Sequence, residues 1–100
     1  MTELETYNKQ IQSLCNLYNV KTLFAFGSVT TDKYRPDSDI DLIVDIESND
    51  PFDYSDKYFN LKFQLEDLLH RQIDLLEDKA IRNPYLRAQI DKTKVLVYGK

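Results

Sequence analysis

Residues 26–46 read FGSVTTDKYRPDSDIDLIVDI and hold the pattern that decides the fold. The apolar run from Leu23 to Phe26 leads into the small Gly27-Ser28 pair. Ten residues later, Asp39 and Asp41 open a second apolar run. This order predicts two strands joined by a polar loop, with a phosphate-binding turn beside two carboxylates. The pattern indicates nucleotide chemistry.

The spacing of Asp39 and Asp41 predicts that both carboxylates lie on one face of a strand, because residues i and i+2 of an extended chain project together. The intervening apolar residues then project from the other face and can pack beneath helices: Ile40, Leu42, Val44 and Ile46. Mg²⁺ prefers one or two protein carboxylates together with substrate phosphates. We therefore predict that Asp39 and Asp41 are catalytic residues and metal ligands.

The Gly27-Ser28 pair predicts the phosphate-binding half of the site. A glycine allows the backbone to approach a phosphate closely, and a serine hydroxyl at the start of a helical turn can donate to a phosphate oxygen. Thr30 and Thr31 add hydroxyl donors nearby. We predict that Gly27, Ser28, Thr30 and Thr31 bind the nucleotide.

A third carboxylate is expected for phosphoryl-transfer chemistry, because metal ions need bridging ligands and the acceptor hydroxyl must lose its proton. Asp74 lies inside a short apolar run and could stand beside Asp39 and Asp41 if the two strands are neighbours. We predict that Asp74 is the third catalytic and metal-binding residue. Of the nearby acids, Asp37 is expected to cap the turn and Asp45 to be a charge at the strand end.

Together, Gly27-Ser28, the ten-residue gap, Asp39-x-Asp41 and the later Asp74 resemble the DNA polymerase β-like nucleotidyltransferase superfamily. The chain length and the PDSDIDL stretch (residues 36–42) are similar to those of minimal nucleotidyltransferases, the antitoxins paired with HEPN-domain toxins. The resemblance implies a mixed sheet and a Mg²⁺-dependent transfer of AMP from ATP to a hydroxyl, with Mn²⁺ as an alternative metal. It also implies that the acceptor is a tyrosine of a HEPN-domain RNase toxin.

One segment departs from the pattern of that family. Many relatives carry Ala-Arg-Gly where this chain has Thr30, Thr31 and Asp32. The missing arginine removes a cation that could hold the nucleotide phosphates, and either Lys33 or Arg35 is an alternative. This departure bears on substrate affinity more than on the class of reaction.

Length, charge and cysteine content bound the remaining possibilities. One hundred residues predict a single domain over residues 1–100. The single Cys15 excludes an intramolecular disulfide and favours a cytoplasmic location. We expect no membrane span and no signal peptide. The net charge of −4 disfavours direct binding to nucleic acid and favours a basic protein partner.

Hydrophobic periodicity and capping residues predict helices that alternate with strands. This order indicates an α/β fold of the α+β type, with helices packed on a small sheet, and it permits the mixed sheet that the resemblance implies. The expected helices span residues 2–19, 52–69 and from Asn83-Pro84 to about Asp91, and the expected strands span residues 22–26, 39–46, 72–76 and 94–98.

The helix expected over residues 52–69 carries two apolar stripes. One contains Leu61 and Leu65, and Phe59 and Phe63 form the other. The second stripe indicates either a helix buried on two sides or a patch for a partner or for self-association. His70 is expected to be a charge at the end of this helix rather than a catalytic residue.

Three functions are consistent with the sequence. The first is an AMP-transferring antitoxin that modifies a tyrosine of its toxin. The second is an antitoxin that masks its toxin with weak or no catalysis, which the altered Thr30-Thr31-Asp32 segment keeps open. The third is a nucleotidyltransferase for a small molecule. Because a chain of this length has few residues with which to enclose a small acceptor, the sequence favours a macromolecular acceptor.

Overall fold

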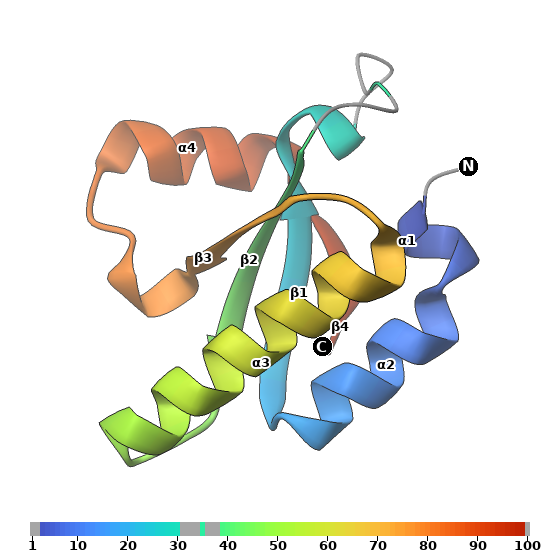
Figure 1. Cartoon of the computed structure of the whole chain (residues 1–100). Coiled ribbons are helices and arrows are strands. Elements are labelled where there is room, and N and C mark those ends of the chain that lie inside the picture. The colour runs from blue at the N-terminus through green and yellow to red at the C-terminus, as the bar shows by residue number, and fades with distance from the viewer. Residues whose placement is uncertain (1–2, 31–34, 36–38, 100) are drawn as a thin grey trace.

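A computed structural model describes residues 3–30, 35 and 39–99 of the chain (Figure 1). The elements are, in chain order, α1 (Glu3–Thr6), α2 (Asn8–Leu17), β1 (Val20–Phe26), the 3-10 turn η1 (Gly27–Thr30), β2 (Ile40–Ile46), α3 (Pro51–Leu69), β3 (Ile73–Glu77), the 3-10 turn η2 (Asp78–Ala80), α4 (Pro84–Thr93) and β4 (Val95–Tyr98). The predicted alternation of helices and strands is confirmed.

The four strands form one sheet in the order β3-β2-β1-β4. β1 runs antiparallel to both β2 and β4, whereas β2 and β3 are parallel and α3 connects them. The sheet is therefore mixed, and helices pack on it, as predicted. β2 and β1 are its two inner strands, so the segment that carries the Asp-x-Asp motif lies in the middle of the fold.

The two faces of β2 have different roles. The apolar residues on one face are fully buried against α2 and α3, in a cluster that includes Leu42, Leu61 and Leu65. On the other face, Ile43 packs in a smaller cluster with Phe26 of β1 and Ile90 of α4. α4 therefore covers the face to which Asp41, two residues before Ile43, also belongs.

The predicted single helix over residues 2–19 is wrong, because the chain leaves helical geometry at Tyr7 (φ −104°, ψ 24°). α1 is a separate short helix that tertiary contacts hold in place. Leu4 is buried in the main cluster, Tyr7 packs against it, and Glu3 pairs with Arg71 at 3.4 Å. Such contacts override the helical periodicity of the sequence.

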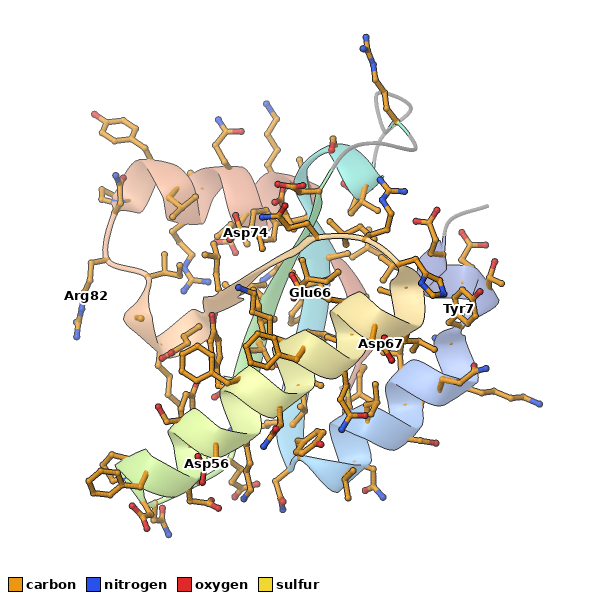
Figure 2. All side chains as sticks on the ribbon, in the orientation of Figure 1. Tyr7, Asp56, Glu66, Asp67, Asp74 and Arg82 are labelled. Carbon is orange, nitrogen blue, oxygen red and sulfur yellow. The ribbon has the colours of Figure 1, made fainter. Side chains whose placement is uncertain are left out.

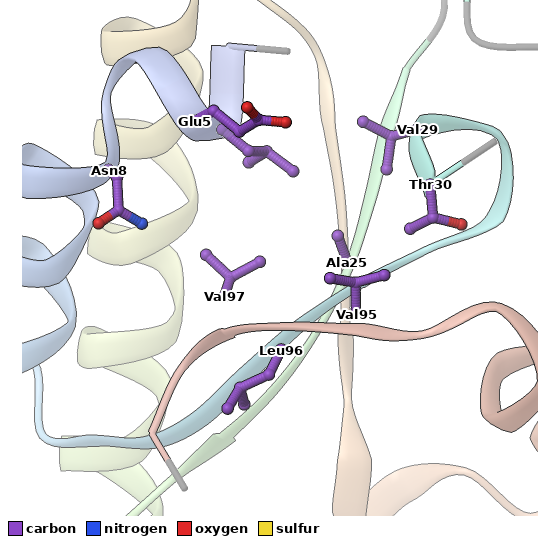
Figure 3. Close-up of a pocket in the computed structure, with 9 residues that line it drawn as sticks. Glu5, Asn8, Ala25, Val29, Thr30, Val95, Leu96 and Val97 are labelled. Atoms are coloured by element: carbon purple, nitrogen blue, oxygen red, sulfur yellow. The ribbon is translucent and has the colours of Figure 1, made fainter. Parts of the chain in front are cut away.

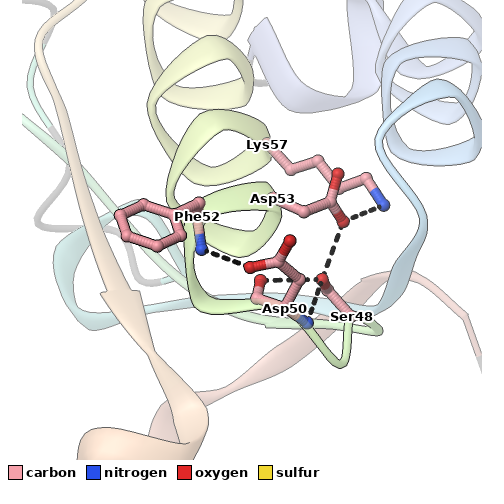
Figure 4. Close-up of polar contacts among 5 residues, drawn as sticks. All are labelled: Ser48, Asp50, Phe52, Asp53 and Lys57. Atoms are coloured by element: carbon pink, nitrogen blue, oxygen red, sulfur yellow. Dashed lines mark hydrogen bonds and ion pairs between the residues drawn. The ribbon is translucent and has the colours of Figure 1, made fainter.

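The segment between β2 and α3 caps the start of the helix (Figure 4). The Asp50 carboxylate accepts a hydrogen bond of 3.0 Å from the Phe52 amide, and Pro51 occupies the first turn. The Ser48 hydroxyl donates to Asp53 at 2.7 Å, and Lys57 pairs with the same carboxylate at 2.8 Å. The Asp50 contact satisfies one of the free amides at the start of the helix, and the contacts of Asp53 connect the first turn to Ser48 and Lys57.

Side chains of α3 also occupy the outer edge of β3. The Glu66 carboxylate accepts a hydrogen bond of 3.0 Å from the Ile73 amide, and the Tyr58 hydroxyl donates to the Leu75 carbonyl. Unpaired backbone groups at the edge of a sheet otherwise attract other strands. α3 thus fixes the position of β3, which carries Asp74.

The apolar stripe of Phe59 and Phe63 is exposed, so of the two alternatives the helix buried on two sides is wrong. The two residues are 50% and 59% exposed, and their rings stack with centroids 6.3 Å apart.

None of the described helices is long and apolar enough to cross a lipid bilayer.

Ile90 anchors α4 to the sheet, because it is fully buried on the face that carries Asp41. We expect Ile90→Ala to lower the free energy of unfolding by about 2–5 kcal/mol through lost burial and a residual cavity. Tyr85→Ala, on the same helix at a position that is 83% exposed, should change it by less than about 0.5 kcal/mol. Urea titrations of both variants measure the difference, and equal effects would contradict this role of Ile90.

Candidate active site

Two predicted site residues lie side by side on neighbouring strands. The parallel register of β2 and β3 pairs Asp41 directly with Asp74. The antiparallel register of β2 and β1 pairs Asp41 with Phe26, the residue before Gly27. Paired residues in a sheet share a face, so both carboxylates lie on the side that α4 covers. Figure 2 labels Asp74 on β3, below α4 in that view.

Asp41 is electrostatically strained by this arrangement. Its pKa is raised above the ordinary value of 3.8, first by burial and then by the negative charges of Asp74 and Asp39. Asp39 lies one residue before β2 and is exposed, so the predicted strand over residues 39–46 begins one residue later than expected. The three carboxylates are therefore close enough to interact, although Asp39 is not held by the sheet.

Gly27 lies against the Asp41 carboxylate. Its φ is +73°, a left-handed conformation that favours glycine. A Cβ atom at this position would lie 2.7 Å from Asp41 Oδ2. A side chain would therefore be strained by the backbone and would also displace the carboxylate. Position 27 has to be glycine for the turn to close against Asp41.

The hydroxyl of Thr30 is already used inside the turn. It donates a hydrogen bond of 2.8 Å to the Gly27 carbonyl and so closes η1. To donate to a phosphate, Thr30 would have to give up this bond, although its oxygen can still accept. Ser28 lies in the same turn. The predicted nucleotide-binding residue Thr31 lies outside the described residues, as do Asp32, Lys33 and Asp37.

Within the described part of the chain, none of the three carboxylates forms an ion pair with a lysine or arginine. Arg35, a suggested substitute for the missing arginine, is exposed, and its carbonyl accepts a hydrogen bond of 2.9 Å from Arg71. The negative charge at Asp39, Asp41 and Asp74 is therefore uncompensated by the described side chains.

These residues fit a divalent cation that is shared with a substrate. No group of three described acidic, histidine or cysteine side chains converges closely enough to hold a metal ion alone. A pair of mutually repelling carboxylates supplies the hard oxygen ligands that Mg²⁺ uses when phosphates complete its coordination. The donor set thus suits a magnesium-bound nucleotide better than a structural metal.

Asp45 lies next to the last residue of β2, in agreement with the expected charge at the strand end, but it is mostly buried and paired. Its side chain is only 14% exposed and pairs with Lys79 of η2 at 3.3 Å. Together with burial and the charge of Glu77, Asp45 also helps to raise the pKa of Tyr54 to about 12. The Asp45–Lys79 ion pair links the far end of β2 to η2, and it is separate from the carboxylates around Asp41.

A cavity of about 560 Å³ lies between α1, η1 and β4 (Figure 3). Ala25 and Val97 line it, and both belong to the side of the sheet that faces the main core. Asp41 and Asp74 project from the other side. The cavity touches the turn at Val29 and Thr30 but does not include the carboxylates.

Sequence reasoning missed one residue that contacts the turn. The Gly27 amide donates a hydrogen bond of 3.0 Å to the hydroxyl of Thr93, the last residue of α4. The two residues are 66 positions apart. Thr93 belongs to no motif, and no local pattern could have signalled this contact.

Comparison with known proteins agrees with this geometry. Residues 9–100 match the family described as polymerase beta nucleotidyltransferase. The chain belongs to this family. The predicted resemblance and the predicted enzyme class, nucleotidyltransferase, are confirmed at this level.

Two relatives of this nucleotidyltransferase come from Methanocaldococcus jannaschii, and both are named as candidate protein adenylyltransferases. The first is 32% identical over 93 residues, covering 93% of this chain and 92% of the relative. The second is 36% identical over 80 residues, covering 80% of this chain and 79% of the relative. The similarity therefore extends over most of each protein.

Solved structures share the fold. A candidate minimal nucleotidyltransferase superposes with a TM-score of 0.76 at 29% identity over 95% of each chain. A toxin–antitoxin structure with AMP-PNP has a TM-score of 0.71 at 20% identity, over 93% of this chain and 73% of the other. A tri-AMPylated HEPN toxin of Shewanella oneidensis in complex with its MNT antitoxin has a TM-score of 0.66 at 18% identity, over 97% and 73%. The predicted polymerase β-like fold is confirmed.

The raised pKa of Asp41 predicts a pH-dependent cost to stability. Because the pKa is higher in the folded state, ionisation of Asp41 lowers stability as the pH rises from 3.8 through the folded pKa. Without metal or nucleotide, we expect Asp41→Asn to raise the Tm at pH 7 by roughly 2–4 °C.

This gain should fade as the pH drops and disappear well below pH 3.8, where the Asp41 carboxyl is protonated in both states. Calorimetry in EDTA across the pH range measures it. Asp67→Asn, which removes one exposed carboxylate from α3, is the control for net charge. A stability gain in Asp41→Asn that persists unchanged at low pH would show that the ionisation of Asp41 is not its source.

Proposed function

We propose that this nucleotidyltransferase transfers AMP from ATP to a tyrosine hydroxyl of a HEPN-domain toxin and thereby acts as its antitoxin. The observation that carries the proposal is the pairing of Asp41 with Asp74 beside the glycine turn, with its charge uncompensated by described side chains. The names of the relatives support a protein as the acceptor. The fold shared with toxin–antitoxin complexes supports a toxin as that protein.

In this proposal Asp39, Asp41 and Asp74 hold Mg²⁺, with Mn²⁺ as an alternative. The metal, when bound, neutralises charge on the phosphates and so favours attack at phosphorus. Gly27 keeps the turn close to Asp41, and Ser28 presents its amide and hydroxyl to the phosphates. These residues orient the triphosphate so that its α-phosphate faces the acceptor.

The transfer forms one bond and breaks another. The tyrosine oxygen attacks the α-phosphorus of ATP, a new oxygen–phosphorus bond forms, and pyrophosphate leaves. The proton of the tyrosine hydroxyl passes to the Asp74 carboxylate, which acts as the base. The products are O-adenylylated tyrosine and pyrophosphate.

A protein partner suits the surroundings of this site. The net charge of −4 favours a basic partner. We place this reaction in the cytoplasm, in keeping with a single cysteine, Cys15, that is buried and unpaired. The exposed Phe59 and Phe63 remain a candidate surface for contact with a partner or a second copy.

Masking without catalysis is the second candidate function, and one observation favours it. Thr30 occupies a position where many relatives have the alanine of Ala-Arg-Gly, and its hydroxyl is spent on the Gly27 carbonyl. The family arginine is absent from the next position. A weakened phosphate site would leave binding to the toxin intact while catalysis declined.

Binding of nucleotide and metal should stabilise the protein by linkage. At concentrations about 100-fold above the Kd, ligand binding adds about 2.7 kcal/mol to stability. We therefore expect ATP with Mg²⁺ to raise the Tm of the wild type by several degrees and ATP with EDTA to raise it much less. Asp41→Asn should abolish the shift, and Asp67→Asn should keep it. If ATP with Mg²⁺ raised the Tm of Asp41→Asn as much as that of the wild type, Asp41 would not be a ligand of the metal.

Co-expression with the HEPN protein of a neighbouring gene tests the reaction itself. Intact-mass spectrometry should show that protein with one or more added AMP groups, and tryptic mapping should place them on tyrosine. The doubly substituted variant Asp39→Asn, Asp41→Asn should leave it unmodified. An unmodified partner that still co-purifies with the wild type, and is still neutralised, would support masking instead.

A further inference from the structure

Thr93 connects the end of α4 to the turn that carries Gly27. Its Oγ1 accepts the hydrogen bond of 3.0 Å from the Gly27 amide. The same hydroxyl donates to the Gln89 carbonyl one turn earlier in the helix, at 3.1 Å. The second bond orients the hydroxyl, because its proton is committed to the helix and a lone pair faces Gly27.

Gly27 is thereby held from two sides. The Asp41 carboxylate lies where a side chain would be, 2.7 Å from the position of a Cβ, and Thr93 binds the amide. A glycine in a left-handed conformation has wide backbone freedom, so its geometry depends on such contacts. The Thr93 bond restrains the residue of η1 that lies against the Asp41 carboxylate.

α4 is a firm base for this restraint. Ile90, one turn before Thr93, is fully buried with Phe26 and Ile43. Beyond Thr93, Lys94 pairs with Asp91 at 3.2 Å, and its ammonium lies 4.9 Å from the centre of the Phe24 ring. The end of the helix is thus fixed to the same strand, β1, that delivers Gly27.

We propose that Thr93 is a positioning residue that sets the Gly27-Ser28 turn for nucleotide binding, an inference that rests on the proposed function. Because the Gly27 amide is bonded to Thr93, it does not serve as a phosphate donor. Gly27 contributes its shape and left-handed backbone, and the phosphates take their hydrogen bonds from the residues that follow it. α4 therefore influences the active site through the bond between Thr93 and Gly27.

A merely structural role makes a different prediction. Helical threonines often bond the carbonyl four residues earlier, and such a bond needs no partner elsewhere. Ser13 of α2 does this with the Lys9 carbonyl at 3.2 Å and provides a matched control. If Thr93 only stabilised α4, removing its hydroxyl would lower the Tm without changing Gly27 or the affinity for nucleotide.

The test compares Thr93→Val, which keeps the shape of the side chain, with Thr93→Ser, which keeps the hydroxyl. Thr93→Ala is a second variant without the hydroxyl, and Ser13→Ala is the control. For each protein we would measure amide hydrogen exchange at Gly27 without nucleotide, the apo Tm, and the Kd for ATP with Mg²⁺ by calorimetry.

We expect Thr93→Val and Thr93→Ala to speed exchange at Gly27 and to weaken ATP binding by roughly 3–10-fold, the effect of one lost hydrogen bond. Thr93→Ser and Ser13→Ala should stay within about twofold of the wild type in Kd, which is less than 0.5 kcal/mol.

The inference would be overturned if Thr93→Val and Thr93→Ala both kept the wild-type rate of exchange at the Gly27 amide, or both kept the wild-type Kd for ATP. Either result would leave the proposed function in place. A wild type that does not bind ATP with Mg²⁺ would overturn the proposed function, and the inference with it.

Discussion

The parallel pairing of β2 with β3 is the constraint on which the rest of the structure depends. It places Asp41 opposite Asp74, and burial, together with the negative charges of Asp74 and Asp39, raises the pKa of Asp41. Burial of the apolar side chains on the opposite face of β2 offsets the free-energy cost of an ionised Asp41 in the folded state. Burial of one large aliphatic side chain contributes about 1.5–3 kcal/mol, and β2 buries several, Leu42 and Val44 among them, against α2 and α3. The stabilisation from this apolar burial is larger than the cost of ionising Asp41, so β2 can carry the charged carboxylate in the folded state.

Alternation along single strands made much of this arrangement predictable from the sequence. In β2, every second residue from Ile40 to Ile46 is apolar and Asp41 lies between two of them, so the faces of Asp41 and Leu42 followed directly. The strand that carries Asp74 was recognisable for the same reason. The pairing of the two strands was only an expectation, because register depends on contacts that no single segment encodes.

The features that sequence reasoning missed depend on distant contacts. The break at Tyr7 follows from packing of α1 against the core and from the pairing of Glu3 with Arg71, far along the chain. Asp45 is a mostly buried ion-pair partner because η2 brings Lys79 to it. Thr93 lies beside Gly27 because β4, which follows Thr93, pairs with β1, which precedes Gly27. Periodicity reports which face a residue occupies but not what stands opposite that face.

The negative charge of the site affects the form in which ATP can bind. ATP is a polyanion, and Asp39, Asp41 and Asp74 present it with negative charge that no described cationic side chain offsets. In the proposed function, the triphosphate therefore has to arrive with its cation, because free ATP would be repelled at short range. A chain with the family arginine could attract free ATP, whereas this chain has Thr31 at that position. In the proposed function, phosphate recognition at this position therefore depends on the metal rather than on a side chain.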